Sequence, residues 1–538
     1  MTALLLAWGC EKENPTDPAT PDDEAAGCGE VRGPVQPEGT DYEDPLVVVQ
    51  AGDSGDGTLR RAIANAAEGD VIIFDANLAG ETIALDSELY IDKGLTLDGG
   101  DARGLVLSGN NSNRIFRVEA EKEVTLRHLT ISNGKANNSG AIDPDLSRGR
   151  GGAIITENKA HLTLSHCTMA DNTANQGGAV FSGYKASLVV RNCRFEANTG
   201  TGNTLQDGNE GVLTGGAITA QGESEGKLEI YNSRFMNNEG VIGGAVGVIH
   251  TAVTIDNCEF TGNQSAATNA NEQTSGHGGA IYTDGASGKT NGEAHGGVIE
   301  IYHSLIKNNQ SQHEGGGALL FTYDPDEVVV EQTTFEGNTV TERPGYGAFG
   351  GGLRNGGGAI TIRQCAFINN VSEGKGGGMY LDNYSPATIV HTTISGNEAR
   401  KPDNSGGQGA GLMVATDDPV SLEHITLANN VARFQGGGFS GKGTNTTLAH
   451  SIIYNNVAEN NGNGWDIKHH TTAQLNDGDG NFQWPAKNPD DQSDINITAE
   501  ATIADPQLRE LTSEEQECYL PYHPVPGDSP AAGKGAQP

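Results

Sequence analysis

One short pattern repeats through most of this chain of 538 residues. A polar residue is followed three positions later by an apolar residue and three positions after that by asparagine, as in Asn192-Cys-Arg-Phe195-Glu-Ala-Asn198. The polar residues of successive copies lie 25 to 46 residues apart, and the shortest spacings, 25 and 26, give the length of one unit. Because a unit this short cannot bury its own apolar residues, repeats of it stack as a solenoid. We call the polar positions the ladder positions: His166, Asn192, Asn232, Asn257, His303, Gln332, Gln364, His391, His424 and His450.

A glycine element accompanies the repeat. Two glycines and a small or apolar residue, as in Gly177-Gly-Ala179 and Gly316-Gly-Ala318, end 11 to 15 residues before most ladder positions. Paired glycines indicate a sharp corner with positive φ. Short alternating segments such as His161-Leu-Thr-Leu164 lie between the two elements and read as strands.

These elements predict an all-β protein, a single-stranded parallel β-helix whose coils stack about 4.8 Å apart. The apolar column points inward, and the asparagine column lies at a turn where side-chain amides hydrogen-bond from coil to coil. We expect a right-handed solenoid, which is the usual hand of parallel crossovers.

The two ends of the repeat region differ from its middle. Leu59, Ile63 and Ala66 fall on one face of a short helix near the N-terminus, which would cap the open end of the solenoid. Insertions fall on one turn of the repeat and so project from one edge, which is where binding loops commonly gather. They cover residues 134–150, 199–214, 264–277, 339–350 and 398–408, and a further insertion on a different turn covers 283–297.

Charge and cysteine content exclude several classes of protein. Asp and Glu number 70 against 33 Lys and Arg, so the net charge is −37. Such a field repels phosphate backbones, so we expect no nucleic-acid partner. No CxxC zinc motif occurs, and four cysteines follow ladder positions directly, which favours small core side chains over disulfides.

The N-terminus predicts a membrane anchor. A short apolar run from Met1 ends in Gly9-Cys10, and a stretch rich in Pro, Asp and Thr follows. This segment resembles a bacterial lipoprotein signal with Cys10 as the lipidated residue. The expected organisation is a signal at 1–10, a flexible tether at 11–45, an N-terminal cap with the first coils at 46–127, a repeat β-helix at 128–460 and a loop-rich C-terminal cap at 461–538.

Three segments resemble known bacterial surface proteins. The glycine element and the Phe195-to-Asn198 type of motif are similar to the GGA(I/L/V) and FxxN repeats of the polymorphic outer-membrane-protein family. The segment from Asp56 to Phe74 resembles the CSLREA-type N-terminal region of right-handed β-helix surface proteins. The segment from Ala504 to Ala531 resembles the choice-of-anchor tail of the same proteins. These resemblances imply a surface-exposed β-helix.

Few residues suggest chemistry. Six histidines of the repeat, the five at ladder positions and His128 in a degenerate first copy, occupy positions that also accept Asn or Gln, so a structural role is expected for them. Towards the C-terminal end, Tyr282, Arg354, Tyr380 and Asp382 would suit a sugar-binding cleft that combines aromatic stacking with charged clamps. We expect no metal site and no cofactor. Calcium at an acidic loop is compatible with the charge, but no loop has the full ligand pattern, including 476–481.

Three functions remain open. The leading one is a lipid-anchored, non-catalytic adhesion or binding protein at the bacterial cell surface or outer membrane, or secreted, that takes an extracellular polysaccharide or a surface protein as its partner. The second is a polysaccharide lyase or glycoside hydrolase that acts in the insertion-lined groove, where Asp382 with Arg354 or Lys375 is the best available set. The third is a structural spacer. The sequence identifies no catalytic residue.

Overall fold

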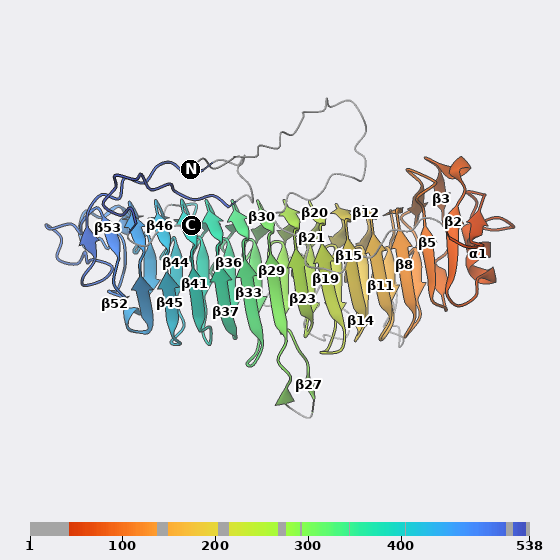
Figure 1. Ribbon diagram of the computed structural model, residues 1–538, viewed down its shortest axis with the longest axis horizontal. Coiled ribbons are helices and arrows are strands. Elements are labelled where there is room, and N and C mark those ends of the chain that lie inside the picture. The colour runs from red at the N-terminus through yellow and green to blue at the C-terminus, as the bar shows by residue number, and fades with distance from the viewer. Residues whose placement is uncertain are drawn as a thin grey trace, which may run out of the picture.

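Four long parallel sheets run the length of the molecule. The computed structural model describes residues 42–136, 149–202, 215–266, 276–290, 293–343, 345–403, 405–512 and 520–533, so Cys10 lies outside the described residues. Sheet A extends from β1 (Leu46–Val48) to β52 (Asn476–Asp477) and sheet B from β3 (Thr82–Ala84) to β54 (Thr502–Ile503). Sheet C extends from β4 (Leu89–Ile91) to β48 (Phe439–Gly441), and sheet D from β13 (Thr173–Ala174) to β51 (Val457–Ala458). Figure 1 shows the strands stacked in chain order along one axis.

One coil passes once through each sheet. A representative coil consists of β14 (Val180–Tyr184), β15 (Ser187–Arg191), β16 (Arg194–Glu196) and β17 (Thr199–Gly200), which belong to sheets C, A, B and D in that order. The next strand of sheet A, β19 (Lys227–Tyr231), pairs with β15 in parallel, with Leu188 opposite Leu228. Equivalent residues of successive coils therefore lie next to one another. The predicted all-β parallel β-helix is confirmed.

The core consists of inward-pointing columns. In sheet B, Phe195, Phe235 and Phe260 stack with ring centroids 4.6 and 4.8 Å apart, and all three are fully buried. Alternation along each strand creates these columns, because every second side chain points to the same face. Parallel in-register stacking then removes the apolar faces of neighbouring coils from water together.

A column of asparagines lies at the turn from sheet B to sheet D. Asn198 donates from Nδ2 to Oδ1 of Asn238 in the next coil at 2.9 Å and to the carbonyl oxygen of Met169 at 2.9 Å. The same arrangement runs unbroken through Asn172, Asn198, Asn238, Asn263, Asn309, Asn338, Asn370, Asn397, Asn430 and Asn456.

The glycine corner lies one residue earlier in the later coils than the Gly-Gly-Ala motif predicts. Gly278, the first residue of its glycine pair, has positive φ as expected. In the next coil the residue with positive φ is Gly315, which precedes the predicted pair Gly316-Gly317. Ala318 therefore pairs with Ile281 and not with Ala280. The reason is a third glycine, which replaces the alanine of the earlier coils and moves the apparent Gly-Gly-Ala motif by one position. From residue 315 onward, each residue after the glycine corner therefore lies one column later than the predicted motif implies.

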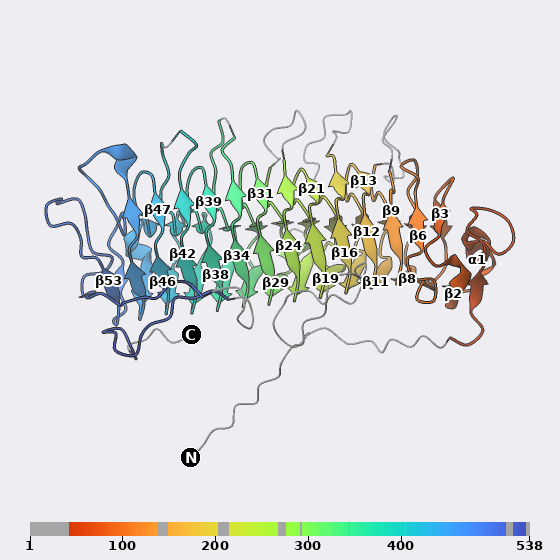
Figure 2. The ribbon, with the colours of Figure 1, turned by 90° about the horizontal axis from the view of Figure 1, so that it is seen from above.

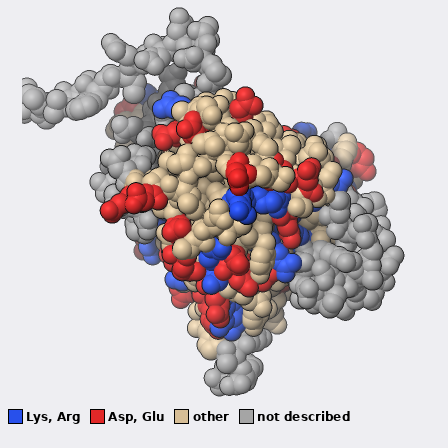
Figure 3. Space-filling view, turned by 90° about the vertical axis from the view of Figure 1, so that its right-hand side faces the viewer, with Lys and Arg blue, Asp and Glu red and all other residues tan. Residues whose placement is uncertain are grey.

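The chain differs in structure at the two ends of the solenoid. Helix α1 (Leu59–Asn65) buries Leu59 and Ile63, and Thr58 caps its N-terminus by accepting a hydrogen bond from the Arg61 amide. Figure 3 looks onto this end, where acidic and basic side chains are interspersed. At the other end, residues 520–533 return along the outer face of sheet B (Figure 2), and His523 Nε2 lies 2.8 Å from Ser395 Oγ.

The insertions on the common turn join sheet D to sheet C. The described examples lie between β35 (Thr339–Val340) and β36 (Leu353–Gly356), and between β43 (Glu398–Ala399) and β44 (Leu412–Val414). Figure 2 shows these connections along one long edge of the solenoid. Residues 137–148, 203–214 and 267–275 of the other insertions lie outside the described residues.

Candidate functional site

The ladder positions share one backbone conformation. All ten have φ between 44° and 56°, at the turn from sheet A to sheet B. Their side chains meet from coil to coil: Asn192 Nδ2 lies 3.0 Å from His166 Nε2, and the rings of His391 and His424 stack at 4.6 Å. A short polar side chain is tolerated in the left-handed region better than a bulky apolar one. This requirement explains why His, Asn and Gln alternate here.

The four residues expected to bind a ligand lie on and beside one column of sheet C. Tyr282 is on β26 (Ile281–Asp284), Arg354 on β36, and Tyr380 on β40 (Met379–Leu381), all on its outer face. Leu319 lies between Tyr282 and Arg354 in this column. The structure therefore brings Arg354, Tyr380 and Asp382 together and leaves Tyr282 two coils from Arg354.

The Arg354 guanidinium is enclosed by carboxylates of this chain. It forms ion pairs with Glu314 and with Asp382, and its Cζ lies 5.8 Å from the ring centre of Tyr380. The side chains of Arg354 and Glu314 are only 14% and 11% exposed. We call this set, with His277 and His313, the Arg354 cluster. Both carboxylates are thus already paired with the guanidinium.

Two histidines complete the cluster. His277 Nδ1 lies 3.0 Å and His313 Nε2 3.5 Å from carboxylate oxygens of Glu314. Burial lowers the pKa of His313 to about 4, assisted by the neighbouring His277. Burial also raises the pKa of Tyr282 well above its usual range. The cluster is thus a largely buried part of the scaffold, with little surface left for a ligand.

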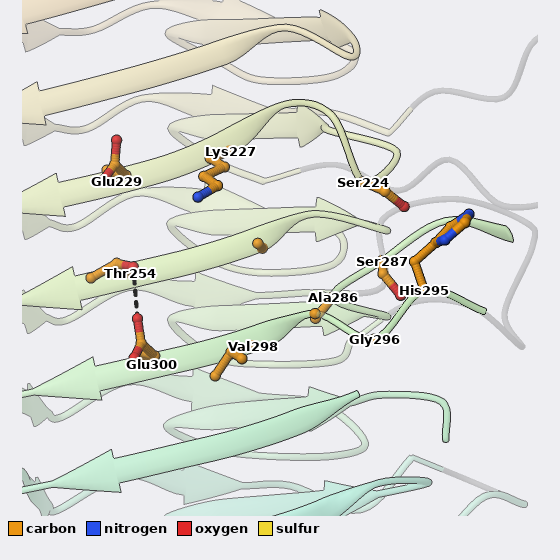
Figure 4. Close-up of a pocket in the computed structure, with 12 residues that line it drawn as sticks. Ser224, Lys227, Glu229, Thr254, Ala286, Ser287, His295, Gly296, Val298 and Glu300 are labelled. Atoms are coloured by element: carbon orange, nitrogen blue, oxygen red, sulfur yellow. Dashed lines mark hydrogen bonds between the residues drawn. The ribbon is translucent and has the colours of Figure 1, made fainter. Parts of the chain in front are cut away.

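An open pocket lies elsewhere, beside the insertion on the different turn. Between β26 and β29 (Val298–Tyr302) the chain leaves the solenoid as a hairpin, in which β27 (Lys289–Thr290) pairs antiparallel with β28 (Glu293–Ala294). Figure 1 shows this hairpin projecting away from the stacked strands. The pocket between its base and the outer face of sheet A has a volume of about 360 Å³ (Figure 4). We call it the hairpin pocket.

Three neighbouring strands of sheet A form the floor of the hairpin pocket. Lys227 and Glu229 come from β19, Ala252 and Thr254 from β23 (Ala252–Asp256), and Val298 and Glu300 from β29. Strand alternation turns these side chains outward and leaves their neighbours, such as Leu228 and Ile299, in the core. Ser224, Ser287 and His295 line the side towards the hairpin (Figure 4).

Hydroxyl groups orient the two carboxylates of the floor. Tyr231 Oη donates to Glu229 at 3.1 Å, and Tyr302 Oη donates to Glu300 at 2.9 Å. Thr254 Oγ1 lies between the two carboxylates in the column and donates to the second Glu300 oxygen at 3.1 Å (Figure 4). The aromatic ring of Tyr231 in turn stacks against Arg191, with Cζ 4.4 Å from the ring centre.

A buried aspartate holds the hairpin in place. Asp326, which is 2% exposed, lies just before β33 (Glu327–Glu331) in the next coil. It accepts hydrogen bonds from the Ala286 amide at 2.7 Å, the Ser287 hydroxyl at 2.7 Å and the Gly297 amide at 2.8 Å. Both arms of the hairpin base are therefore fixed to the solenoid by one carboxylate. Such charge-assisted bonds are stronger than neutral ones.

Sequence reasoning did not identify the floor of this pocket or Asp326. One signal was available: the insertion at 283–297 departs from the turn that the other insertions share. The alternation in Lys227-Leu-Glu-Ile also implies that Lys227 and Glu229 point outward. Neither signal locates Asp326, because a single aspartate in a loop has no pattern.

The described residues offer neither a metal-binding cluster nor a helix that could span a membrane. The described residues contain no group of three or more His, Cys, Asp or Glu side chains placed to hold a metal ion. In the segment that suggested a calcium loop, Asp477 instead accepts from the Asp479 and Glu500 amides at 3.0 and 2.8 Å. No helix in the described ranges has the length and apolar character that a membrane crossing requires.

Comparison with known proteins gives remote structural likenesses. No protein-family model matches the chain, and no curated protein matches it. Tailspike protein 3 of bacteriophage CBA120 is similar over 90% of this chain and 69% of its own, with 12% identity and a TM-score of 0.38. The surface adhesin PfbA of Streptococcus pneumoniae is similar over 90% of this chain and 99% of its own, with 11% identity and a TM-score of 0.36. Identities this low do not transfer either protein's role to this chain.

Proposed function

We propose that this protein is a non-catalytic, lipid-anchored β-helix protein of the bacterial cell surface that binds an extracellular polysaccharide through the hairpin pocket. Cys10 would carry the lipid, and residues 11–45 would hold the solenoid away from the membrane. A surface protein as the partner in place of a polysaccharide is the other possibility that the same architecture allows.

One observation carries this proposal: the hairpin pocket combines a fixed wall with a floor of polar side chains. Its volume of about 360 Å³ lies within the range of small-ligand sites. Carboxylates, hydroxyls and an ammonium group line it, and these are the groups that bind sugar hydroxyls. Since Asp326 and the tyrosine hydroxyls hold the wall and the carboxylates in place, a ligand meets an ordered site.

A glycan-array screen tests the proposal. The probe is the full chain carrying Cys10→Ser, which keeps it soluble, and each hit is repeated with Glu300→Gln. We expect a polysaccharide to be retained by the parent and lost or weakened at least tenfold in the variant. Retention that is equal in both proteins would move binding away from the pocket. No retention on any glycan would favour a protein partner or a spacer.

The lipid anchor needs its own test. Wild-type protein and Cys10→Ser are expressed in the native host, and cells are fractionated. We expect the wild-type protein in the membrane fraction and the variant in the medium or periplasm. If both distribute alike, Cys10 does not anchor the protein.

A glycoside hydrolase is the second candidate, because Glu229 and Glu300 occupy the same column of sheet A with Thr254 between them. Two coil spacings are about 9.6 Å, close to the separation of roughly 6.5–9.5 Å between the carboxyl groups of inverting enzymes. The test is product analysis on every glycan that binds. Release of shortened chains by the parent, and none by Glu229→Gln or Glu300→Gln, would establish the enzyme; intact glycan supports the binding protein.

A further inference from the structure

The carboxylates of the hairpin pocket have no described cation beside them, in contrast to those of the Arg354 cluster, which pair with the guanidinium. Within the described part of the chain, Glu229 and Glu300 have no ion-pair partner within 4.0 Å and accept only from hydroxyl groups. Both side chains are partly exposed. Tyrosine and threonine hydroxyls orient a carboxylate but leave its charge in place. The pocket floor therefore presents two anionic groups to a ligand.

The single lysine of the pocket does not neutralise them. Lys227 is exposed, and its ammonium group has no described partner within 4.0 Å. It occupies the column nearer the hairpin, whereas Glu229 and Glu300 share the next column along the strand (Figure 4). The positive and negative groups are thus separated across the floor, which gives the pocket a defined polarity.

We propose that the hairpin pocket recognises a sugar residue that carries a protonated amino group, such as an unacetylated amino sugar within a polysaccharide. The inference rests on the proposed function and names its ligand class. The amino group lies over the Glu229–Glu300 column, while Lys227 and the Ser224 hydroxyl, at the hairpin side, donate to hydroxyl oxygens of the same sugar.

Electrostatics favours this class over the other sugars. An acidic sugar would approach a protein of net charge −37 against repulsion. A neutral sugar would cover two carboxylates and supply only hydroxyl donors, so part of the desolvation cost would remain. An ammonium group provides both the opposite charge and three donors. Either Glu can pair with such a group, and the two carboxylates lie two coil spacings, about 9.6 Å, apart along the column with Thr254 between them.

Matched disaccharides test the inference. The probes are the disaccharide of β-1,4-linked glucosamine and its fully N-acetylated twin, titrated calorimetrically at pH 6 and low salt into the full chain carrying Cys10→Ser. We expect the free-amine disaccharide to bind at least tenfold more tightly than its twin. Glu229→Gln and Glu300→Gln each reduce that affinity at least fivefold. Lys227→Gln keeps a donor for the sugar hydroxyl but removes a like charge, so it should increase the affinity severalfold.

A charge-matched control excludes general attraction to an acidic protein. Glu123→Gln changes an exposed glutamate on the same face of sheet A, at the start of β8 (Glu123–Arg127) and three strands before β19 at the pocket edge. It is expected to leave the affinity unchanged. An equal loss in Glu123→Gln and Glu300→Gln would overturn the inference.

The two proposals fail differently. If the acetylated twin or an acidic glycan binds equally well or better and Glu300→Gln weakens it, the pocket binds polysaccharide but the amino-sugar inference is wrong. If neither disaccharide binds and the glycan array is also blank, the proposed polysaccharide function itself fails.

Discussion

Asn238 and Asn263 are joined side chain to side chain between neighbouring coils. Nδ2 of Asn238 donates to Oδ1 of Asn263 at 2.9 Å, and the backbone amide of Asn238 donates to the same oxygen at 3.0 Å. Both residues are at most 1% exposed. One buried oxygen therefore satisfies two donors of the preceding coil, and this arrangement recurs along the solenoid.

Replacing one member of the asparagine column is expected to be costly. Asn238→Ala removes the acceptor for the Asn198 backbone amide and side chain, which leaves two buried donors without a partner. At 1–3 kcal/mol for each unsatisfied group, the free energy of unfolding should fall by about 3 kcal/mol. Urea unfolding followed by circular dichroism measures it. Asn237→Ala is the control: Asn237 is exposed, and alanine must adopt its left-handed backbone conformation (φ 53°), which asparagine tolerates better, at a cost of about 1 kcal/mol. Equal losses in the two variants would contradict the ladder argument.

The cysteines that follow ladder positions should make the protein sensitive to alkali. Cys258 Sγ donates to the Asp256 carbonyl oxygen, and burial raises the pKa of both Cys258 and Cys365 to about 12. An unfolded thiol has a pKa of about 8.5. Between these values the unfolded chain loses thiol protons that the folded chain keeps. Stability is therefore complete below about pH 8.5 and falls by about 1.4 kcal/mol per pH unit for each thiol as the pH rises towards 12.

Serine substitutions separate this effect from other alkaline titrations. Ser233 and Ser304 occupy the position of Cys258 in the flanking coils and donate to the equivalent carbonyl oxygens, so Cys258→Ser with Cys365→Ser should preserve the fold. Urea unfolding from pH 8.5 to 11 should show a shallower loss in the double variant, by about 3 kcal/mol per pH unit. Parallel curves for the two proteins would show that these thiols do not titrate as stated.

The sequence predicts the architecture because the architecture is periodic. Phe195 and Asn198 recur at fixed spacing in coil after coil, and only a stack of equivalent coils buries them all. The same reasoning misplaced the later glycine corners by one residue, because Gly315-Gly-Gly317 offers two ways to choose a pair. Strand pairing resolves the choice, since Ala318 must lie opposite Ile281 for the inward columns to continue.

The candidate site was less predictable because it depends on features that occur once. The spacing of the repeat brought Tyr380 and Asp382 near Arg354, yet Glu314, which closes the cluster, lies outside the strands, on the turn before β32 (Ala318–Phe321). The hairpin pocket depends on Asp326, whose three acceptor contacts come from residues 29 to 40 positions away. No spacing rule connects such partners.

The Arg354 cluster is expected to act on stability and not on binding. Arg354→Met leaves the Glu314 and Asp382 carboxylates without their cation in a largely buried setting, and breaking a buried pair costs about 3–5 kcal/mol. Unfolding by urea should show this loss, while affinity for a pocket ligand stays within twofold. Arg363→Met, at an exposed position on β37 (Ala359–Arg363), should cost less than about 0.5 kcal/mol. A loss of ligand affinity in Arg354→Met without loss of stability would instead make the cluster a binding site.

Removing Asp326 should loosen the hairpin and leave the solenoid intact. Asp326→Ala abolishes the three hydrogen bonds that hold Ala286, Ser287 and Gly297, and the amides at 286 and 297 are then free to exchange. Hydrogen exchange followed by mass spectrometry should show faster labelling of the hairpin base, at least tenfold, with unchanged protection in β29 and β33. Affinity for a pocket ligand should fall by a similar factor, because the wall must be ordered again on binding. Glu327→Ala changes the exposed neighbouring carboxylate and should alter neither quantity. Unchanged labelling at 286–297 in Asp326→Ala would show that the hairpin is held by other contacts, and a pocket ligand that still binds the loosened hairpin at full strength would separate the binding site from this wall.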